Sequence, residues 1–223
     1  MHNTYSVDQL KTWGKCQKKY EYKFVRKLDW PSDPKNFRLG KAVHQLLDYE
    51  ANHLPLEAIL TDADHDIVNT WRLLSQSSWA MLPVIATEWG FSLEVEKRWL
   101  YGRIDRIARD GDDIHILDWK TGTGIPLSAE TDWQTRLYLY AVYLSQQWLG
   151  FSVPYEQLVF TYVQAKSGDI KTVQVRYSKA MHQEIHQQLV ETFHHAEATT
   201  THRLPSQCPD KYCPYATICG IQL

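Results

Sequence analysis

Residues 92–120 contain three consecutive stretches in which apolar and polar residues alternate, and no other feature of the chain limits its fold so much. The stretches read SLEVEKRWL, GRIDRIAR and DIHILDWK. A period of two is typical of strands that bury one face. Asp110-Gly111 indicates a hairpin turn between the second and third stretches. The sequence therefore predicts three adjacent strands in the middle of the chain.

Segments with helical spacing precede these strands. Ser6 and Gln9 form the pattern of a capping box for a helix that runs through Cys16. Apolar residues at helical spacing predict two further helices, over residues 37–52 and 63–82.

The second half of the chain also contains both kinds of element. Thr131 or Asp132 can cap a helix that ends near Trp148. LVFTYVQ and IKTVQVRY then predict a hairpin around Ser167-Gly168, and a last long helix begins at Ser178. This order predicts an α/β fold in which a mixed sheet is flanked by helices.

The length and composition fit a single domain over residues 1–223. No stretch approaches the roughly 20 consecutive apolar residues of a membrane span, and the start, MHNTYSVDQL, has no signal-peptide core. We therefore expect a cytoplasmic protein with no membrane partner. The net charge of -2 argues against a general polyanion-binding protein.

One segment departs from this average charge. Between Lys11 and Lys27, basic and aromatic residues are interleaved, a mixture that suits single-stranded nucleic acid because cations attract phosphates and rings stack on unpaired bases. The alternative is a solvated helix face whose aromatic residues belong to the core. The interleaved residues are Lys15, Lys18, Lys19, Tyr20, Tyr22, Lys23, Phe24 and Arg26.

Two opposite charges, Asp118 and Lys120, stand at the end of the apolar run in ILDWKTG. Burial of an unpaired charge is costly, so the pair needs either a bound ion or a salt bridge. Hairpin parity places Asp105, Asp118 and Lys120 on one face of the sheet for any two-residue loop. With Gly111-Asp112 as the loop, Asp105 lies opposite Asp118; with Asp110-Gly111, it lies opposite Ile116.

Two neighbouring carboxylates repel each other unless a cation lies between them, and oxygen ligands suit magnesium or manganese. Such an ion can activate water and neutralise charge on a phosphate, while a nearby lysine positions the nucleophile. The pattern predicts a hydrolase for phosphodiesters. A salt bridge between Asp118 and Lys120 on a solvated sheet face is the alternative that the spacing leaves open.

Four short motifs occur in order between residues 40 and 138. They are G-K-A-V-H (Gly40 to His44), G-R-I-D (Gly102 to Asp105), D-W-K-T-G (Asp118 to Gly122) and Q-T-R-L-Y (Gln134 to Tyr138). This ordered set resembles the PD-(D/E)XK nuclease superfamily, and its RecB-like branch in particular. The resemblance implies a restriction-endonuclease-like fold and a metal-dependent DNA nuclease.

The resemblance also implies roles for individual residues. His44, Asp105 and Asp118 would bind the catalytic metal together with the carbonyl oxygen of Trp119, and Lys120 would assist the attacking water. A nitrogen ligand beside two carboxylates is tolerated better by manganese than by magnesium, so we expect stronger activity with manganese.

Further residues are expected around this centre. Gln134 and Tyr138 lie four residues apart on one helical face and would hold the DNA strand or the lysine. One of Glu88, Glu94 and Glu96 is expected to join the acidic site, and the sequence does not indicate which.

The four cysteines are divided between the two ends of the chain, which predicts a shared metal rather than cytosolic disulfides. They are Cys16, Cys208, Cys213 and Cys219. The pattern resembles the iron-sulfur staple of RecB-like nucleases, including AddB subunits and the CRISPR-associated exonucleases of the Cas four family. It implies a [4Fe-4S] cluster held by residues 1–36 and 203–223 around a nuclease core of residues 37–202. Zinc is the alternative, and the four-residue gap between Cys208 and Cys213 departs from the usual C-x-x-C.

The resulting hypothesis is a single-strand DNA exonuclease that, by resemblance, trims spacer precursors beside a CRISPR integrase complex. The alternative from a different class is a non-catalytic DNA-binding or adaptor subunit that retains the fold and cluster. For a remaining histidine group we expect a solvated polar helix; its members are His182, His186, His194, His195 and His202.

Overall fold

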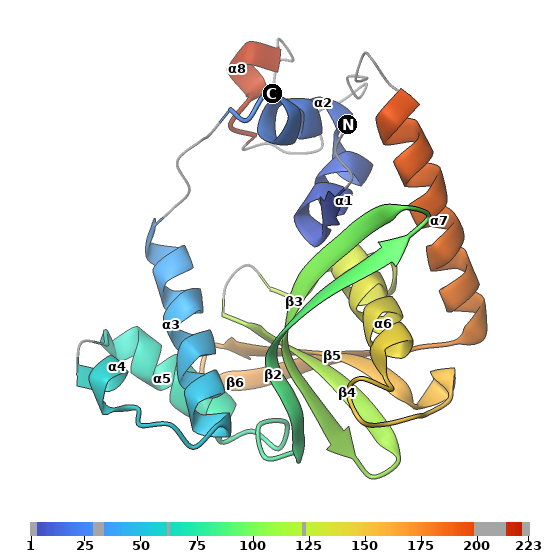
Figure 1. Ribbon diagram of the computed structural model, residues 1–223. Helices are drawn as coiled ribbons and strands as arrows, with labels where there is room; N and C mark the ends of the chain where they lie inside the picture. Colours follow the sequence, from blue (N-terminus) through green and yellow to red (C-terminus); the bar gives the residue numbers. More distant parts are fainter. Residues whose placement is uncertain (1–3, 29–33, 62, 122–123, 199–212, 220–223) are drawn as a thin grey trace. The chain divides into compact units, whose positions relative to one another are not determined.

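The computed structural model describes residues 4–28, 34–61, 63–121, 124–198 and 213–219. These residues belong to two compact units, whose elements are labelled in Figure 1. The terminal unit comprises Met1–Ser32, Ser92–Tyr101 and His186–Leu223. The central unit comprises Asp33–Phe91 and Gly102–Ile185.

The strands form a mixed sheet, as the sequence predicts. Its order is β1-β3-β4-β5-β6, and β2 pairs with β3. The β1–β3 and β4–β5 pairs are parallel, whereas β3–β4 and β5–β6 are antiparallel. The bounds are β1 Thr4–Ser6, β2 Val84–Val95, β3 Arg98–Asp110, β4 Asp113–Lys120, β5 Leu158–Lys166 and β6 Asp169–Arg176.

The helices flank the strands in the chain order expected from the sequence. They are α1 Val7–Lys15, α2 Gln17–Tyr20, α3 Pro34–Ala51, α4 Glu57–Thr61, α5 His65–Ser75, α6 Trp133–Ser145, α7 Lys179–Ala198 and α8 Ala216–Cys219. A π-helical turn covers η1 Glu21–Val25, and short 3₁₀ turns cover η2 Ala129–Thr131 and η3 Tyr155–Gln157. In the part of the chain that the structure describes, no helix combines the length and the apolar character needed to span a bilayer.

The predicted helix starts are confirmed by their caps. Ser6 Oγ accepts the N–H of Gln9 at 3.2 Å, while the side-chain oxygen of Gln9 accepts the N–H of Ser6 at 2.7 Å. Asp132, rather than Thr131, caps α6 by accepting the N–H of Gln134 at 2.8 Å. These bonds satisfy N–H groups that have no partner within the helix.

Two predicted boundaries are wrong. The helix expected over residues 63–82 ends at Ser75, where serine side chains bond to the backbone; Ser77 Oγ donates to the carbonyl of Leu74 at 2.6 Å. SLEVEKRWL is not one strand, because Glu96 and Lys97 have φ of 50° and 63° and form the turn between β2 and β3. Glutamate and lysine are unusual in such a turn, which favours glycine and asparagine.

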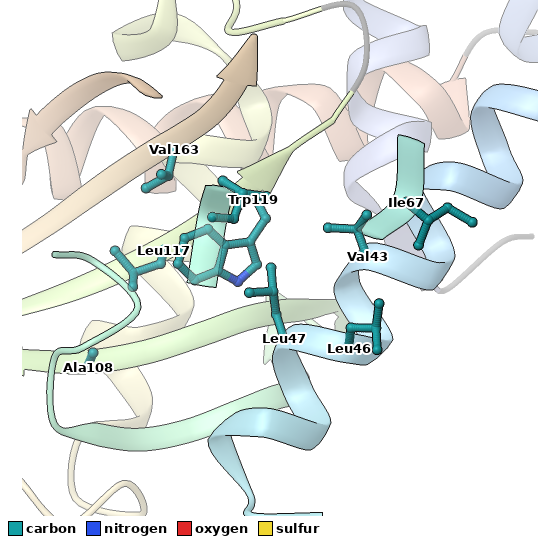
Figure 2. Close-up of a cluster of buried hydrophobic side chains, with 9 residues drawn as sticks. Val43, Leu46, Leu47, Ile67, Ala108, Leu117, Trp119 and Val163 are labelled. Atoms are coloured by element: carbon teal, nitrogen blue, oxygen red, sulfur yellow. The ribbon is translucent and has the colours of Figure 1, made fainter. Parts of the chain in front are cut away.

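The core of the central unit lies between the sheet and helices α3 and α5. Figure 2 shows the indole of Trp119 beside Leu47 of α3. The buried cluster consists of Val43, Leu46, Leu47, Ile67, Leu74, Ala108, Leu117, Trp119 and Val163. Burying each large apolar side chain contributes about 1.5–3 kcal/mol, so this cluster fixes α3 against the sheet.

The other face of the same strands meets α6. Tyr162, which neighbours Val163 on β5, shares a hydrogen bond of 2.9 Å with Thr135 of α6. Because side chains alternate along a strand, residues next to Leu117 and Trp119 on β4 also face α6. Asp118 is one of them.

A buried arginine anchors α3 as well. Arg106 on β3 donates to the carbonyls of Leu47 at 2.8 Å and Ala80 at 3.0 Å. Its guanidinium lies 5.2 Å from the centre of the Trp119 ring. The C-terminal half of α3 is therefore tied to the sheet by polar as well as apolar contacts.

In the terminal unit, segments from the two ends of the chain are in contact. The hydroxyl of Tyr22 donates to the carbonyl of Ile218 at 3.3 Å, and that of Tyr215 donates to the carbonyl of Leu28 at 2.7 Å. Cys16, Cys213 and Cys219 are partly exposed in this unit. Cys208 lies outside the described residues.

The aromatic residues of the basic segment belong largely to the core of the terminal unit. Tyr20 and Tyr22 are buried, and Lys18 and Arg26 each lie 2.5 Å from a carboxylate oxygen of Glu21. For these two tyrosines the structure favours the alternative reading, in which the rings pack internally instead of stacking on bases.

The expectation of a solvated polar helix is wrong for His182. Its ring stacks on Tyr140 with centroids 4.8 Å apart, and its Nδ1 shares a hydrogen bond of 2.8 Å with the Tyr177 hydroxyl. The half-buried imidazole therefore has a packing role within the central unit.

Candidate active site

The site begins where the backbone pairing of β3 and β4 ends. This pairing runs from Asp110–Asp113 to Arg106–Leu117, so the hairpin loop is Gly111-Asp112. The same register extended by one residue sets Asp105 opposite Asp118. Here the N–H of Trp119 donates to Asp105 Oδ2 at 2.9 Å. The carboxylate of Asp105 thus links the two strands beyond their last backbone pair.

Three potential metal ligands converge next to this point. His44 of α3, Glu88 of β2 and Asp105 of β3 each offer one ligand atom, and these atoms lie within 4.8 Å of one another. In the described ranges, no other group of three or more histidine, cysteine or carboxylate side chains has its ligand atoms so close together. Of the three glutamates considered from the sequence, Glu88 is the one in this group. Glu94 and Glu96 belong to the terminal unit.

Glu88 could not have been chosen from strand periodicity. Its φ of 44° is left-handed, which is uncommon for a residue other than glycine. Such conformations are found disproportionately at functional sites. Its carboxylate also lies 2.9 Å from Nε of Arg103, and burial followed by the charge of Asp105 raises the pKa of Glu88.

Both ring nitrogens of His44 face oxygen atoms. Nε2 lies 2.9 Å from the carbonyl oxygen of Trp119, and Nδ1 lies 3.4 Å from Asp105 Oδ1. Burial alone would lower the pKa of His44, but Asp105, Asp118 and the Trp119 carbonyl together raise it to about 9. Without a metal, a protonated imidazole therefore neutralises part of the carboxylate charge.

Asp118 and Lys120 form the salt bridge that the sequence left open, but it is not on a solvated face. Asp118 is 3% exposed, and the ammonium of Lys120 lies 2.7 Å from its Oδ2. The side-chain amide of Gln134 donates to Oδ1 of Asp118, and its carbonyl oxygen accepts from Lys120 at 3.2 Å. Gln134 therefore connects the carboxylate to the lysine. Asp118 is not part of the group of three described above.

The electrostatics of Asp118 favour a cation. Burial and then the charge of Asp105 raise the pKa of Asp118 to about 6, although Lys120 and His44 lower it. Its buried Oδ2 accepts no hydrogen bond of regular geometry. A divalent ion would relieve the repulsion between the carboxylates, so the residues present fit a metal centre.

The distance between His44 and Trp119 fits the same conclusion. Ligands at right angles around an octahedral ion with bonds of about 2.1 Å lie roughly 3 Å apart. The 2.9 Å between Nε2 and the carbonyl oxygen is an ordinary hydrogen-bond length and is also compatible with this separation.

The glycines of two motifs allow close approaches near the site. A Cβ on Gly40 of α3 would lie 3.3 Å from Thr121 Oγ1, just beyond β4. A Cβ on Gly102 would lie only 2.7 Å from the ring of Phe91 and 3.2 Å from that of Tyr138. Side chains at these positions would push α3 or Tyr138 away from the carboxylates.

Tyr138 lies in the core beside the site. It is 8% exposed, and its ring packs edge-on against Phe91 with centroids 5.8 Å apart. Burial and then the charges of Asp105 and Asp118 raise the pKa of Tyr138, so its hydroxyl stays neutral.

The protein-family model for the PD-(D/E)XK nuclease superfamily matches residues 4–220. The chain belongs to this superfamily. PD-(D/E)XK nucleases use divalent metal ions, so DNA is the substrate that membership implies, and the group of His44, Glu88 and Asp105 is a candidate metal site. The mixed sheet flanked by helices is consistent with the restriction-endonuclease-like fold of the superfamily.

Solved structures are similar to this chain at low sequence identity. A candidate exonuclease from Eubacterium rectale matches with a TM-score of 0.59 and 12% identity, over 92% of this chain and 85% of that chain. The protein SSO0001 matches with a TM-score of 0.48 and 17% identity, over 100% of this chain and 88% of that chain. No curated protein gives a significant sequence match to this PD-(D/E)XK nuclease.

Proposed function

We propose that this nuclease removes nucleotides from the ends of single-stranded DNA and that manganese supports it better than magnesium. The observation that carries the proposal is the convergence of His44, Glu88 and Asp105 beside the salt bridge between the buried Asp118 and Lys120. A nitrogen donor among carboxylates favours manganese.

Five groups of the chain would hold the metal: His44, Glu88, Asp105, Asp118 and the carbonyl oxygen of Trp119. When bound, the ion supplies an activated water and neutralises charge on the scissile phosphate. For binding, the imidazole of His44 must first lose the proton that the neighbouring carboxylates stabilise.

Lys120 and Gln134 would act on the water and the phosphate. The Lys120 ammonium is directed by Asp118 and by the side-chain carbonyl of Gln134, and it lies 5.4 Å from the centre of the Tyr162 ring. Fixed in this way, it can donate a hydrogen bond to the nucleophile and stabilise charge that develops in the transition state. Gln134 is a positioning residue in this scheme, because it acts through Asp118 and Lys120.

The preference for strand ends is supported by the resemblance to RecB-like exonucleases and by the fold shared with the Eubacterium rectale protein. It is tested with labelled linear single strands, circular single strands and blunt duplexes of equal length, each with manganese or magnesium. We expect linear single strands to be degraded fastest, and faster with manganese. Cleavage of the circles at the same rate would contradict exonuclease action.

A non-catalytic DNA-binding or adaptor subunit is the second candidate. A binding module has no need for a lysine held against a buried carboxylate beside a candidate metal site, and this arrangement counts against it. Tight binding of DNA with no cleavage under any metal would instead support it.

We also propose that Cys16, Cys208, Cys213 and Cys219 hold a structural [4Fe-4S] cluster. Contacts between the N- and C-terminal segments support a shared site. In the described part of the chain, the sulfur atoms of Cys16, Cys213 and Cys219 do not all come within 4.8 Å of one another. A cluster would spread its thiolates over several irons, and a single zinc ion is the alternative.

The biological setting that we propose, trimming of spacer precursors beside a CRISPR integrase complex in antiviral defence, rests on the resemblance to the Cas four family. Reconstitution of spacer integration with and without this nuclease would test it. Integrated spacers of unchanged length would contradict this setting.

A further inference from the structure

An exposed phenylalanine lies in the same cavity as the metal ligands. The cavity measures about 960 Å³ and is lined by one side of α3, including Phe37, Lys41 and His44, and by Glu88 and Arg103 from the strands. This volume is at the upper end of the range of about 300–1,000 Å³ typical of small-molecule sites. It is therefore large enough to take part of a nucleotide chain.

Phe37 is 69% exposed, although it belongs to a helix whose opposite side is buried. Figure 2 shows Val43, Leu46 and Leu47 of α3 in that buried cluster. A single exposed apolar side chain on a surface is ordinary. An aromatic ring exposed in a cavity that is also lined by His44 and Glu88 is not explained by packing.

Helix geometry sets Phe37 at a defined distance from His44, one of the expected metal ligands. Phe37, Lys41 and His44 follow the spacing i, i+4, i+7 and so share one face of α3. Seven residues span about 10 Å along the helix axis. This length corresponds to roughly three stacked nucleotides at 3.4 Å each, or fewer in an extended strand.

Two cations lie between or beside these positions. Lys41 is exposed one turn after Phe37, and the side chain of Arg103 is 73% exposed while its Nε pairs with Glu88 at 2.9 Å. Cations that follow a strand and a ring on which a base can stack are the two components of single-strand binding sites.

We infer that Phe37 is a stacking platform for one unpaired base of the strand being cut, and that Lys41 and Arg103 bind the phosphates between that base and the metal. This inference rests on the proposed function and names the residues that would select its single-stranded substrate. In a duplex the faces of paired bases are covered by their neighbours, so the platform selects unpaired strands. It tolerates any base, because every base has a π-face.

The binding test uses the inactive Asp118→Asn protein with manganese, so that the labelled strand stays intact while fluorescence anisotropy measures affinity. Adding Phe37→Ala should weaken single-strand binding by about 5- to 100-fold, the range found when one base loses an aromatic partner. Phe37→Tyr should restore most of the affinity, whereas Phe37→Leu should not. Duplex binding should change less than about twofold.

A matched control and an abasic scan make the test specific. Trp148 is 93% exposed in the turn that follows α6, and Trp148→Ala should leave affinity unchanged. Removing the base at one position of the strand should weaken binding to the protein that has Phe37. The same removal should cause no further loss of affinity for the Phe37→Ala variant. Lys41→Ala should reduce the slope of log affinity against log salt by about 0.7, as expected for one phosphate contact.

Equal affinity of the Phe37 and Phe37→Ala proteins for single strands, with no sensitive abasic position, would overturn the inference. Cleavage by the native protein with manganese is measured separately. The result for the proposed nuclease activity is therefore independent of the result for the stacking platform.

Discussion

The Nε2 atom of His44 lies 2.9 Å from the carbonyl oxygen of Trp119, although the two residues are 75 positions apart in the chain. This contact connects α3 to the end of β4. As a hydrogen bond it holds two expected ligands at a separation compatible with neighbouring ligands of one ion. In the absence of a metal, the protonated imidazole supplies a positive charge beside the carboxylates.

Manganese affinity should therefore depend on pH. The carboxylates and the Trp119 carbonyl raise the pKa of His44 to about 9, so below that pH each bound ion displaces one proton. Affinity should rise about tenfold per pH unit between roughly pH 6.5 and 8.5. Calorimetry in buffers with different ionisation enthalpies would count the released proton. His44→Asn should bind more weakly and with little dependence on pH; an unchanged slope in this variant would refute the assignment.

Gln134 should control the rate without controlling the fold. Gln134→Glu removes the amide that donates to Asp118 and places a second carboxylate beside it, so cleavage should fall about 10- to 100-fold. The α6 cap survives, because Asp132 accepts from the backbone N–H of residue 134. Gln147→Glu, an exposed change that follows the same helix, is the control. Equal rates for the two variants would argue against a positioning role.

Gly102 should be intolerant of even one methyl group. Gly102→Ala places its Cβ within 3 Å of the Phe91 ring and close to Tyr138, so the free energy of unfolding should fall by about 1–3 kcal/mol. Gly90→Ala is the matched control in β2, since a Cβ there meets nothing within 4 Å. Urea denaturation measures both. A loss for Gly90→Ala as large as that for Gly102→Ala would show that the effect is not steric.

The cysteine site makes a spectroscopic prediction. Protein purified without oxygen should be brown, with broad absorbance near roughly 400 nm and equal amounts of iron and sulfide. Cys16→Ser should lower the melting temperature before it affects cleavage, because the cluster joins the ends of the chain. Colourless protein that contains stoichiometric zinc would contradict the cluster.

Much of the site could be predicted from the sequence because strands impose a strict alternation. Parity alone placed Asp105, Asp118 and Lys120 on one face, and the observed Gly111-Asp112 loop realises the register that sets Asp105 opposite Asp118. The capping residues of α1 and α6 were equally readable, since their side chains bond locally.

The features that the sequence could not provide depend on irregular backbone or on tertiary burial. Glu88 reaches the metal group from a left-handed position inside a strand, where periodicity gives no guidance. The turn at Glu96 and Lys97 lacks the usual glycine. Burial of Asp118 follows from the packing of α6 against the sheet, which no local pattern encodes.

The most direct test of a metal-dependent nuclease at this site is the rate at which the native protein and Asp118→Asn cleave labelled single-stranded DNA with manganese. Asparagine keeps the shape of the side chain and removes its charge. The account predicts cleavage by the native protein, a rate at least about 100-fold lower for Asp118→Asn, and a native rate for Asp112→Asn in the exposed hairpin loop. Cleavage by Asp118→Asn at the native rate would contradict it.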